Sequence, residues 1–377
     1  MIYEALAARR SPDPAALSTL LAELAADLAH TSVELEAVLE EALRVARHGN
    51  WDAQGIAHQA GRTLGAHETR YVTDLLGGDA RAGDCREPQA GHFRRWSQRE
   101  GVAPPDAVGC AIEVLALLLA LPALPPLGDR SQRPLTAARS GQHARILERV
   151  RALLAKAEST TFPEEAEALS SKAQELMARH AIDEAMLGAG VGADDAPGGV
   201  RLPVDDPYAS AKSILLSEVA SANRCSAVWS KGLGFSTVLG FDSDVGFVEI
   251  LYTSLLVQAT SAMVAAGSRV DRAGRSRTRS FRQSFLLAYA TRIGDRLRAA
   301  EDAGRAAAAE EYGEAMLPVL ADRSAAVAAA RDAAFPGAVT RSVSVTNMAG
   351  WAAGAAAAEL ASLSGRMEMP PDGADRA

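Results

Sequence analysis

The densest group of chemically active side chains in this sequence is a run of arginines. Six of them lie between residues 269 and 282, opposed only by one aspartate: Arg269, Arg272, Arg275, Arg277, Arg279 and Arg282. Three more follow: Arg292, Arg296 and Arg298. Because the arginine side chain offers phosphate a rigid fork of hydrogen-bond donors, such a run is typical of a nucleic-acid contact. The alternative is a solvated basic loop before an amphipathic helix whose Phe281, Phe285 and Tyr289 belong to the core.

A second group of interest is acidic. Asp242 and Asp244 directly precede an apolar stretch that reads as a helix. Carboxylates in that position accept backbone N–H bonds and complement the helix dipole, so we expect them to cap the helix. The alternative is an acidic site that adds Glu249 and serves a hydrolase-like enzyme.

Other chemical signatures are weak. His58 and His67 are nine residues apart, which places them on opposite faces of a continuous helix, and neither HExxH nor a Cys/His cluster occurs. We therefore expect no metal site and no cofactor, and we identify no catalytic residue. His180 continues an apolar stripe and is expected to be a half-buried core histidine. Gly350 and Gly354 are four residues apart, which favours close helix packing over a phosphate loop.

The C-terminal part, which carries both groups, alternates helices with short strands. We expect helices at 211–222, 245–266, 281–303, 306–334 and 351–363, strands at 224–229, 235–241 and 341–345, and a turn at 231–234. This pattern predicts an α+β domain with a small antiparallel sheet.

A helical hairpin precedes that domain. Ile146, Val150 and Leu153 share one helical face, and a capping-box spacing then starts a second helix. We expect four of the hairpin's apolar residues to be buried: Leu154, Leu169, Leu176 and Met177.

The N-terminal part reads as entirely helical. We expect a hairpin over 15–48 with Ser32 as an N-cap, one helix from 52 or 54 to 76, and a buried apolar helix over 107–121. The last of these is too short and too interrupted to span a membrane.

Composition sets the remaining limits. The net charge is −8, and alanine, the best helix former, is abundant. The three cysteines are far apart, and no signal peptide is visible, so we expect a soluble cytoplasmic protein without a membrane contact.

Residues 146–184 resemble a bacterial and phage family, domain of unknown function 2786. The similarity rests on the basic first helix, on Glu164-Glu165-Ala166 and on the run KAQELMARHAID. The segment after it, with TVLGFDSDVGFVEILYTSLL and SFRQSFLLAYATRIGDRL, resembles the companion domain that often follows that family. The resemblance implies no activity and no catalytic residues.

The predicted fold is mainly α, with a helical N-terminal domain, a short helical hairpin and a C-terminal α+β domain. We place the boundaries at 1–121 (helical domain), 122–142 (proline-rich linker), 143–187 (hairpin), 188–206 (flexible linker), 207–368 (α+β domain) and 369–377 (disordered tail). For function we expect a non-enzymatic binding or regulatory module that contacts nucleic acid through the arginine run. The alternative is an enzyme of unknown reaction with its site near Asp242 and Asp244.

Overall fold

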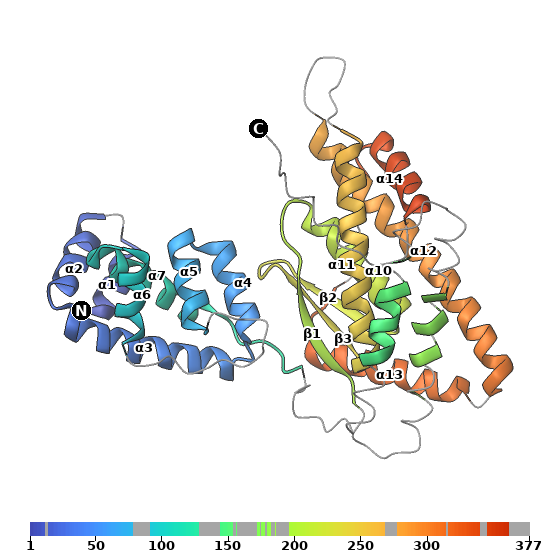
Figure 1. Ribbon diagram of the computed structural model, residues 1–377, viewed down its shortest axis with the longest axis horizontal. Coiled ribbons are helices and arrows are strands. Elements are labelled where there is room, and N and C mark those ends of the chain that lie inside the picture. Colours follow the sequence, from blue (N-terminus) through green and yellow to red (C-terminus); the bar gives the residue numbers. More distant parts are fainter. Residues whose placement is uncertain are drawn as a thin grey trace, which may run out of the picture. The chain divides into compact units, whose positions relative to one another are not determined.

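The computed structural model shows a mainly α-helical chain with a small antiparallel sheet in its C-terminal part (Figure 1). It describes residues 1–11, 14–77, 91–127, 144–153, 156, 172–173, 175–177, 179–181, 185, 196–267, 277–313, 316–339 and 345–361. The chain divides into two compact units, Met1–Pro126 and Leu127–Ala377.

The N-terminal unit is built around one apolar helix. Its elements are α1 (Ile2–Ala8), α2 (Pro14–Ala26), α3 (Leu28–His48), α4 (Ala53–Thr63), α5 (Ala66–Leu75), α6 (His92–Glu100) and α7 (Pro104–Ala120). Helix α7 contacts α1 to α5, and its side chains at Val108, Ile112 and Leu115 are buried. The prediction of a buried apolar helix here is confirmed.

Two helix boundaries in this unit differ from the predicted ones. Helix α3 begins at Leu28, where the Asp27 side chain accepts a hydrogen bond from the His30 backbone N–H at 3.2 Å. Ser32 lies inside that helix and its hydroxyl donates to the Ala29 carbonyl, so the expectation of an N-cap there is wrong. An aspartate side chain is an equally strong cap and lies one turn earlier.

The predicted single helix over 52–76 is also wrong, because it is broken into α4 and α5. Asp52 caps α4 by accepting the Gly55 backbone N–H at 2.6 Å. Leu64 ends α4 in an extended conformation, and Gly65 is the N-cap of α5. A glycine at a helix start costs little, so a second helix can begin there.

The segment after α7, expected to open a linker, is fixed at its start to the N-terminal unit. The Trp51 indole N–H donates to the Pro122 carbonyl at 2.7 Å, and the Asn50 side-chain amide donates to the Leu124 carbonyl at 2.7 Å. The Leu124 backbone N–H donates to the Gly49 carbonyl at 2.9 Å. The corner between α3 and α4 therefore holds residues 122–124 in place.

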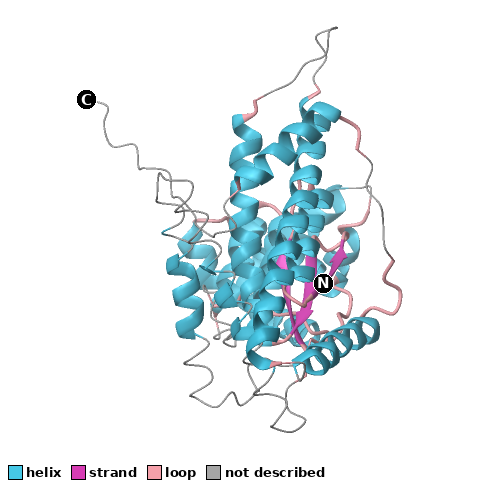
Figure 2. Cartoon of the chain, turned by 90° about the vertical axis from the view of Figure 1, so that its right-hand side faces the viewer, coloured by secondary structure: helices cyan, strands magenta, loops and turns pink. Residues whose placement is uncertain are grey.

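The C-terminal unit contains a three-stranded sheet and long helices. Its elements are β1 (Gly198–Pro203), α10 (Ala209–Ala222), β2 (Ser226–Ser230), β3 (Phe235–Gly240), α11 (Asp242–Ala265), α12 (Thr278–Tyr312), α13 (Met316–Ala334) and α14 (Met348–Leu360). The strand order is β1-β3-β2 and both pairings are antiparallel. Figure 2 shows the strands in magenta among the surrounding helices.

Two of the strands match the predicted pair and its connecting turn. Strand β1 was not predicted, because Gly198–Pro203 lies in a segment that we expected to be a flexible linker. It pairs with β3 in a register that places Gly199 opposite Leu239. A Cβ atom on Gly199 would lie only 2.9 Å from the Leu239 side chain, so the glycine permits this close pairing. The predicted strand at 341–345 falls mainly on residues outside the described part.

Helices α10, α11 and α12 form the main core of this unit together with α14 and one face of the sheet. Helix α11 is the one helix among the described residues that is long and apolar enough to cross a membrane. Its residues Val245, Val248, Leu251 and Leu255 are buried in this core.

The predicted hairpin packs on α11. Residues 144–153 are helical, and Val150 forms a small buried cluster with Ala173, Met177 and Phe247 of α11. Met177 is buried as expected, and Leu176 is partly buried and packs against the same cluster. The predicted core residues Leu154 and Leu169 lie outside the described residues. His180, expected to be half-buried, is fully buried with its ring edge-on to Phe247.

Candidate functional site

The structure describes half of the arginine run. Arg269, Arg272 and Arg275 lie outside the described residues. Arg277 and Arg279 are exposed at the start of α12, and Arg282 is partly buried one turn further on. We call Arg277, Arg279 and Arg282 the basic end of α12.

The aromatic residues that interleave with these arginines belong to the core. Phe281, Phe285 and Tyr289 are each 1% exposed and pack among α10, α11 and α14. The interpretation of these side chains as core residues is confirmed, and none of the three can stack on a base from this position.

The later arginines of α12 have acceptors within the chain. Arg292 pairs with Glu359 and with Asp295, and Arg298 pairs with Glu218 at 2.5 Å and with Asp295 at 2.7 Å. Hydrogen bonding to Glu359 raises the pKa of the Arg292 guanidinium. Arg296 donates to the carbonyls of Ala358 and Ala361 and so closes the end of α14. A cation there complements the negative end of the helix dipole. These three arginines therefore stabilise the fold.

Helices α12 and α14 run parallel, side by side (Figure 1). Gly350 and Gly354 lie against the backbone carbonyls of Phe281 and Phe285, where a Cβ atom at either glycine would overlap the oxygen. Further along, Glu359 meets Arg292. The expectation that these glycines allow close helix packing is confirmed.

The parallel arrangement brings two helix N-termini to the basic end of α12. The first turn of α12 holds no acidic residue, and its N-cap, Arg277, makes no side-chain cap. The first turn of α14 also lacks acid, and its N-cap, Asn347, accepts the Gly350 backbone N–H at 2.9 Å. The Ser284 hydroxyl accepts the backbone N–H groups of Thr346 and Asn347, which fixes the start of α14 beside α12. Positive helix-dipole ends and arginine charges therefore coincide.

The acidic residues singled out in the sequence separate in the structure. Asp242 and Asp244 both lie in the first turn of α11, whose N-cap is Phe241, so neither occupies the cap position. Their carboxylates do lie at the positive end of the helix dipole, as expected. Asp244 is 2% exposed and accepts a hydrogen bond from Arg224 at 3.4 Å. Glu249 is exposed, five residues beyond Asp244 and thus on a different side of the helix.

Arg224 is a site residue that the sequence reasoning missed. It follows the C-cap Asn223 of α10 and has φ 54°, in the left-handed region. Its guanidinium lies 3.4 Å from Asp244 and 3.9 Å from Glu301 of α12, and all three side chains are largely buried. The available signal was an arginine directly after a helix end, where glycine is the usual residue.

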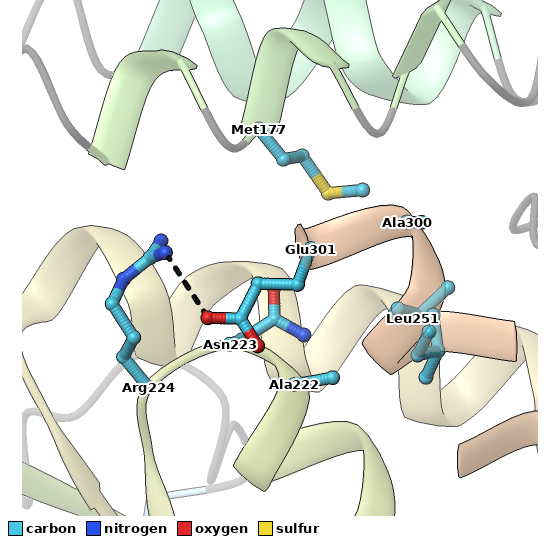
Figure 3. A pocket seen from close by; sticks show the side chains of 8 residues that line it. Met177, Ala222, Asn223, Arg224, Leu251, Ala300 and Glu301 are labelled. Carbon is cyan, nitrogen blue, oxygen red and sulfur yellow. Dashed lines mark ion pairs between the residues drawn. The ribbon is translucent and has the colours of Figure 1, made fainter. Parts of the chain in front are cut away.

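A small pocket adjoins this ion-pair group. It has a volume of about 30 Å³, comparable to one water molecule. Met177 of the hairpin lies on the opposite side from Arg224 and Glu301, and Asn223 and Leu251 complete much of the wall (Figure 3). Small-molecule sites are usually about ten times larger. Asp242, Asp244 and Glu249 do not line it, so the described residues do not gather them around a cleft.

The two candidate sites are far apart. Asp244 and Glu301 of α12 both lie close to Arg224, at 3.4 Å and 3.9 Å. Glu301 is 24 residues, or about 36 Å of helix, beyond Arg277, so the acidic residues lie far from the basic end of α12.

A histidine metal site finds no support among the described residues. The helix that carries His58 and His67 does break, at Leu64 and Gly65. Within the described ranges, however, no three side chains of His, Cys, Asp or Glu come together to hold an ion.

Comparison with known proteins gives one match. Residues 145–184 match the family described as protein of unknown function (DUF2786). No curated protein and no solved structure matches the chain. The match does not include residues 207–368, so their resemblance to a companion domain stays a prediction. The hairpin segment is thus similar to a family whose function is uncharacterised.

Proposed function

We propose that this chain is a non-enzymatic binding module that contacts nucleic-acid phosphates through the basic end of α12. The observation that carries the proposal is the pairing of exposed Arg277 and Arg279 with two parallel helix N-termini. Each helix N-terminus carries about half a positive charge, and backbone N–H groups there bind anions.

The contrast along α12 supports this assignment. Arg292, Arg296 and Arg298 have acceptors within the chain and serve the fold. Among the described residues, Arg279 makes no ion pair, and it is exposed. Removing Arg279 should therefore destabilise the fold little. The Arg279 side chain nevertheless places a positive charge on the surface of a chain whose net charge is −8. Contact with a polyanion would neutralise that positive charge.

We expect the proposed contact to be made with the phosphates of the nucleic acid and not with its bases. Phe281, Phe285 and Tyr289 are buried, so these residues cannot provide the stacking platform of single-strand binders. Contacts to phosphate carry little sequence information. We therefore expect binding with weak sequence preference and strong salt dependence.

The test is a fluorescence-anisotropy titration with a labelled duplex DNA at several salt concentrations. Replacing Arg277 and Arg279 by glutamine should weaken binding and reduce the slope of log K against log salt by up to about 1.8, which is about 0.9 per lost phosphate contact. The matched control replaces Arg44 and Arg331, which are exposed and paired with Glu41 and Asp332. It makes the same change in net charge and should keep the wild-type slope.

Two results would overturn the proposal. If the wild-type chain does not bind DNA or RNA at low salt, no phosphate contact exists. If both double variants show the wild-type slope, the contact does not use the basic end of α12.

A further inference from the structure

The first helix of the hairpin carries a second concentration of positive charge. Among the described residues from 144 to 156, four are basic: Arg145, Arg149, Arg151 and Lys156. One is acidic, Glu148, and Arg151 binds it at 2.7 Å. This helix lies within the segment that matches the family of unknown function.

Three of these cations lie on one side of the helix. Arg145, Arg149 and Lys156 are spaced by four and seven residues, so they project along a single stripe, and all three are exposed. Neither Arg145 nor Arg149 makes an ion pair with an acidic residue in the described part of the chain. We call these three residues the hairpin stripe.

The apolar side of the same helix is already in use. Val150 is fully buried against Ala173, Met177 and Phe247, and Ile146 packs at the edge of that cluster. A basic helix that binds a membrane surface must insert its apolar side into the lipid. Because that side packs on the rest of the hairpin and on α11, the hairpin stripe does not fit a membrane contact.

The distance between the cations of the hairpin stripe indicates the size of the anion that it would bind. Arg145 and Lys156 are eleven residues apart, which corresponds to about 16 Å along the helix. Isolated exposed charges gain little from a single small anion. A duplex presents one negative charge per about 1.7 Å of its axis, so its phosphates can reach Arg145, Arg149 and Lys156 at the same time.

We propose that the hairpin stripe is a second phosphate-binding surface for nucleic acid. This inference rests on the proposed function and extends it to the family-matched segment. The stripe is separate from the basic end of α12, because the hairpin packs on Phe247, near the start of α11. The basic end follows the other end of α11, some 18 residues or about 27 Å further along. Each surface therefore contributes its own share of the salt dependence.

The experiment uses the full chain and the same labelled duplex. Replacing Arg145, Arg149 and Lys156 by glutamine should weaken binding and reduce the salt slope by up to about 2.7, again at about 0.9 per phosphate. The matched control replaces Arg44, Arg151 and Arg331, each of which pairs locally with a glutamate or aspartate. It makes the same change in net charge and should keep the wild-type slope.

A charge-preserving variant guards against a loss of folding. Replacing Arg145 and Arg149 by lysine keeps the charge of the stripe and should keep the salt slope, because the contact is electrostatic. If this variant also loses its slope, the effect is structural and the inference fails.

The remaining outcomes separate the two proposals. Suppose that the stripe variant keeps the wild-type salt slope while the Arg277 and Arg279 variant shows a reduced one. The inference about the hairpin stripe is then wrong, and the proposed function is supported. If only the stripe variant shows a reduced salt slope, the hairpin stripe binds phosphate and the basic end of α12 does not. An acidic protein as the true partner would appear as no DNA or RNA binding by either surface, which would overturn both.

Discussion

Arg224 occupies a backbone conformation that helix ends usually give to glycine. A bulky residue with φ 54° costs roughly 1 kcal/mol relative to glycine. The chain tolerates this cost because the guanidinium reaches Asp244, which is 2% exposed, and Glu301. Arg224 thereby joins the end of α10 to the start of α11 and to α12.

Arg224→Gly should destabilise the chain in spite of relieving the backbone. Removing one partner of a buried ion pair costs about 3–5 kcal/mol, and relief of the left-handed conformation returns about 1 kcal/mol. We expect a net loss of about 2–4 kcal/mol in the free energy of unfolding, measured by urea denaturation. Adding Asp244→Asn should restore part of the loss. If the double variant is as unstable as the sum of the two single variants, the residues are not coupled.

At the scale of elements, glycines decide how closely helices approach. Gly354 lies against the Phe285 carbonyl, whereas Gly61 in α4 faces open space, where an added Cβ atom would meet no other atom within 4 Å. The same substitution should therefore have opposite effects in the two helices.

Gly354→Ala should destabilise the chain by about 1–3 kcal/mol, because the added methyl group forces α14 away from α12. Gly61→Ala should stabilise it by about 0.5–1 kcal/mol, because alanine loses less backbone entropy in a helix. Thermal denaturation of both variants measures the difference. A stabilised Gly354→Ala variant would contradict the close contact of α12 and α14.

The hairpin meets α11 through a small apolar contact centred on Phe247. Phe247→Ala should detach the hairpin, because the ring is fully buried against Val150, Ala173 and Met177. We expect faster hydrogen exchange at residues 144–153, measured by mass spectrometry. Leu255→Ala, which removes core volume from the same helix away from the hairpin, is the control and should leave those residues protected. Equal protection in both variants would mean that Phe247 does not hold the hairpin.

The elements differ in how far the sequence determines them. Strands β2 and β3 follow from β-branched and aromatic residues on both sides of a glycine-containing turn. Strand β1 does not, because Gly198 and Gly199 have little intrinsic strand preference and pair only when β3 supplies a partner. Gly65 is a sequence signal for the break before α5. The residues on both sides of it nevertheless show helical periodicity, which predicts one continuous helix.

The site shows the same division. The exposure of Arg277 and Arg279 could be anticipated from the lack of apolar residues around them. The internal partners of Arg292, Arg296 and Arg298 could not, because Glu359, Ala361 and Glu218 are more than sixty residues away in sequence. The role of Arg224 likewise depends on tertiary contacts with α11 and α12.

At the scale of the whole molecule, buried groups that resist ionisation occur in both units. Burial raises the pKa of the Cys110 thiol to about 12 in the N-terminal unit, with nearby Glu68 adding to the effect. Burial also raises the pKa of Tyr71 in that unit, and of Tyr252 and Tyr289 in the other. The folded state therefore keeps protons that the unfolded chain gives up.

The chain should lose stability at alkaline pH. Unfolded tyrosine titrates near pH 10, so above about pH 10 the folded state binds more protons than the unfolded state, and the free energy of unfolding falls as pH rises. Urea denaturation at several pH values from neutral to strongly alkaline measures this decline. Tyr71→Phe removes a buried hydroxyl that has no hydrogen-bond partner, so it should change stability at neutral pH by less than about 1 kcal/mol and weaken the alkaline decline. A variant with the wild-type pH dependence would rule Tyr71 out as a contributor.

The way the chain leaves the N-terminal unit has a mechanical consequence. Beyond α7, Pro122 and Leu124 are held at the α3–α4 corner by hydrogen bonds with Trp51, Asn50 and Gly49. A pull on the segment after Leu124 would load the two Leu124 hydrogen bonds together, and the bond between Trp51 and Pro122 would be loaded after them. Bonds that share a load resist more force than bonds opened one at a time. The α3–α4 corner thus anchors the chain. Tension on the segment after Leu124 would leave the packing of α7 undisturbed until the hydrogen bonds at this corner broke.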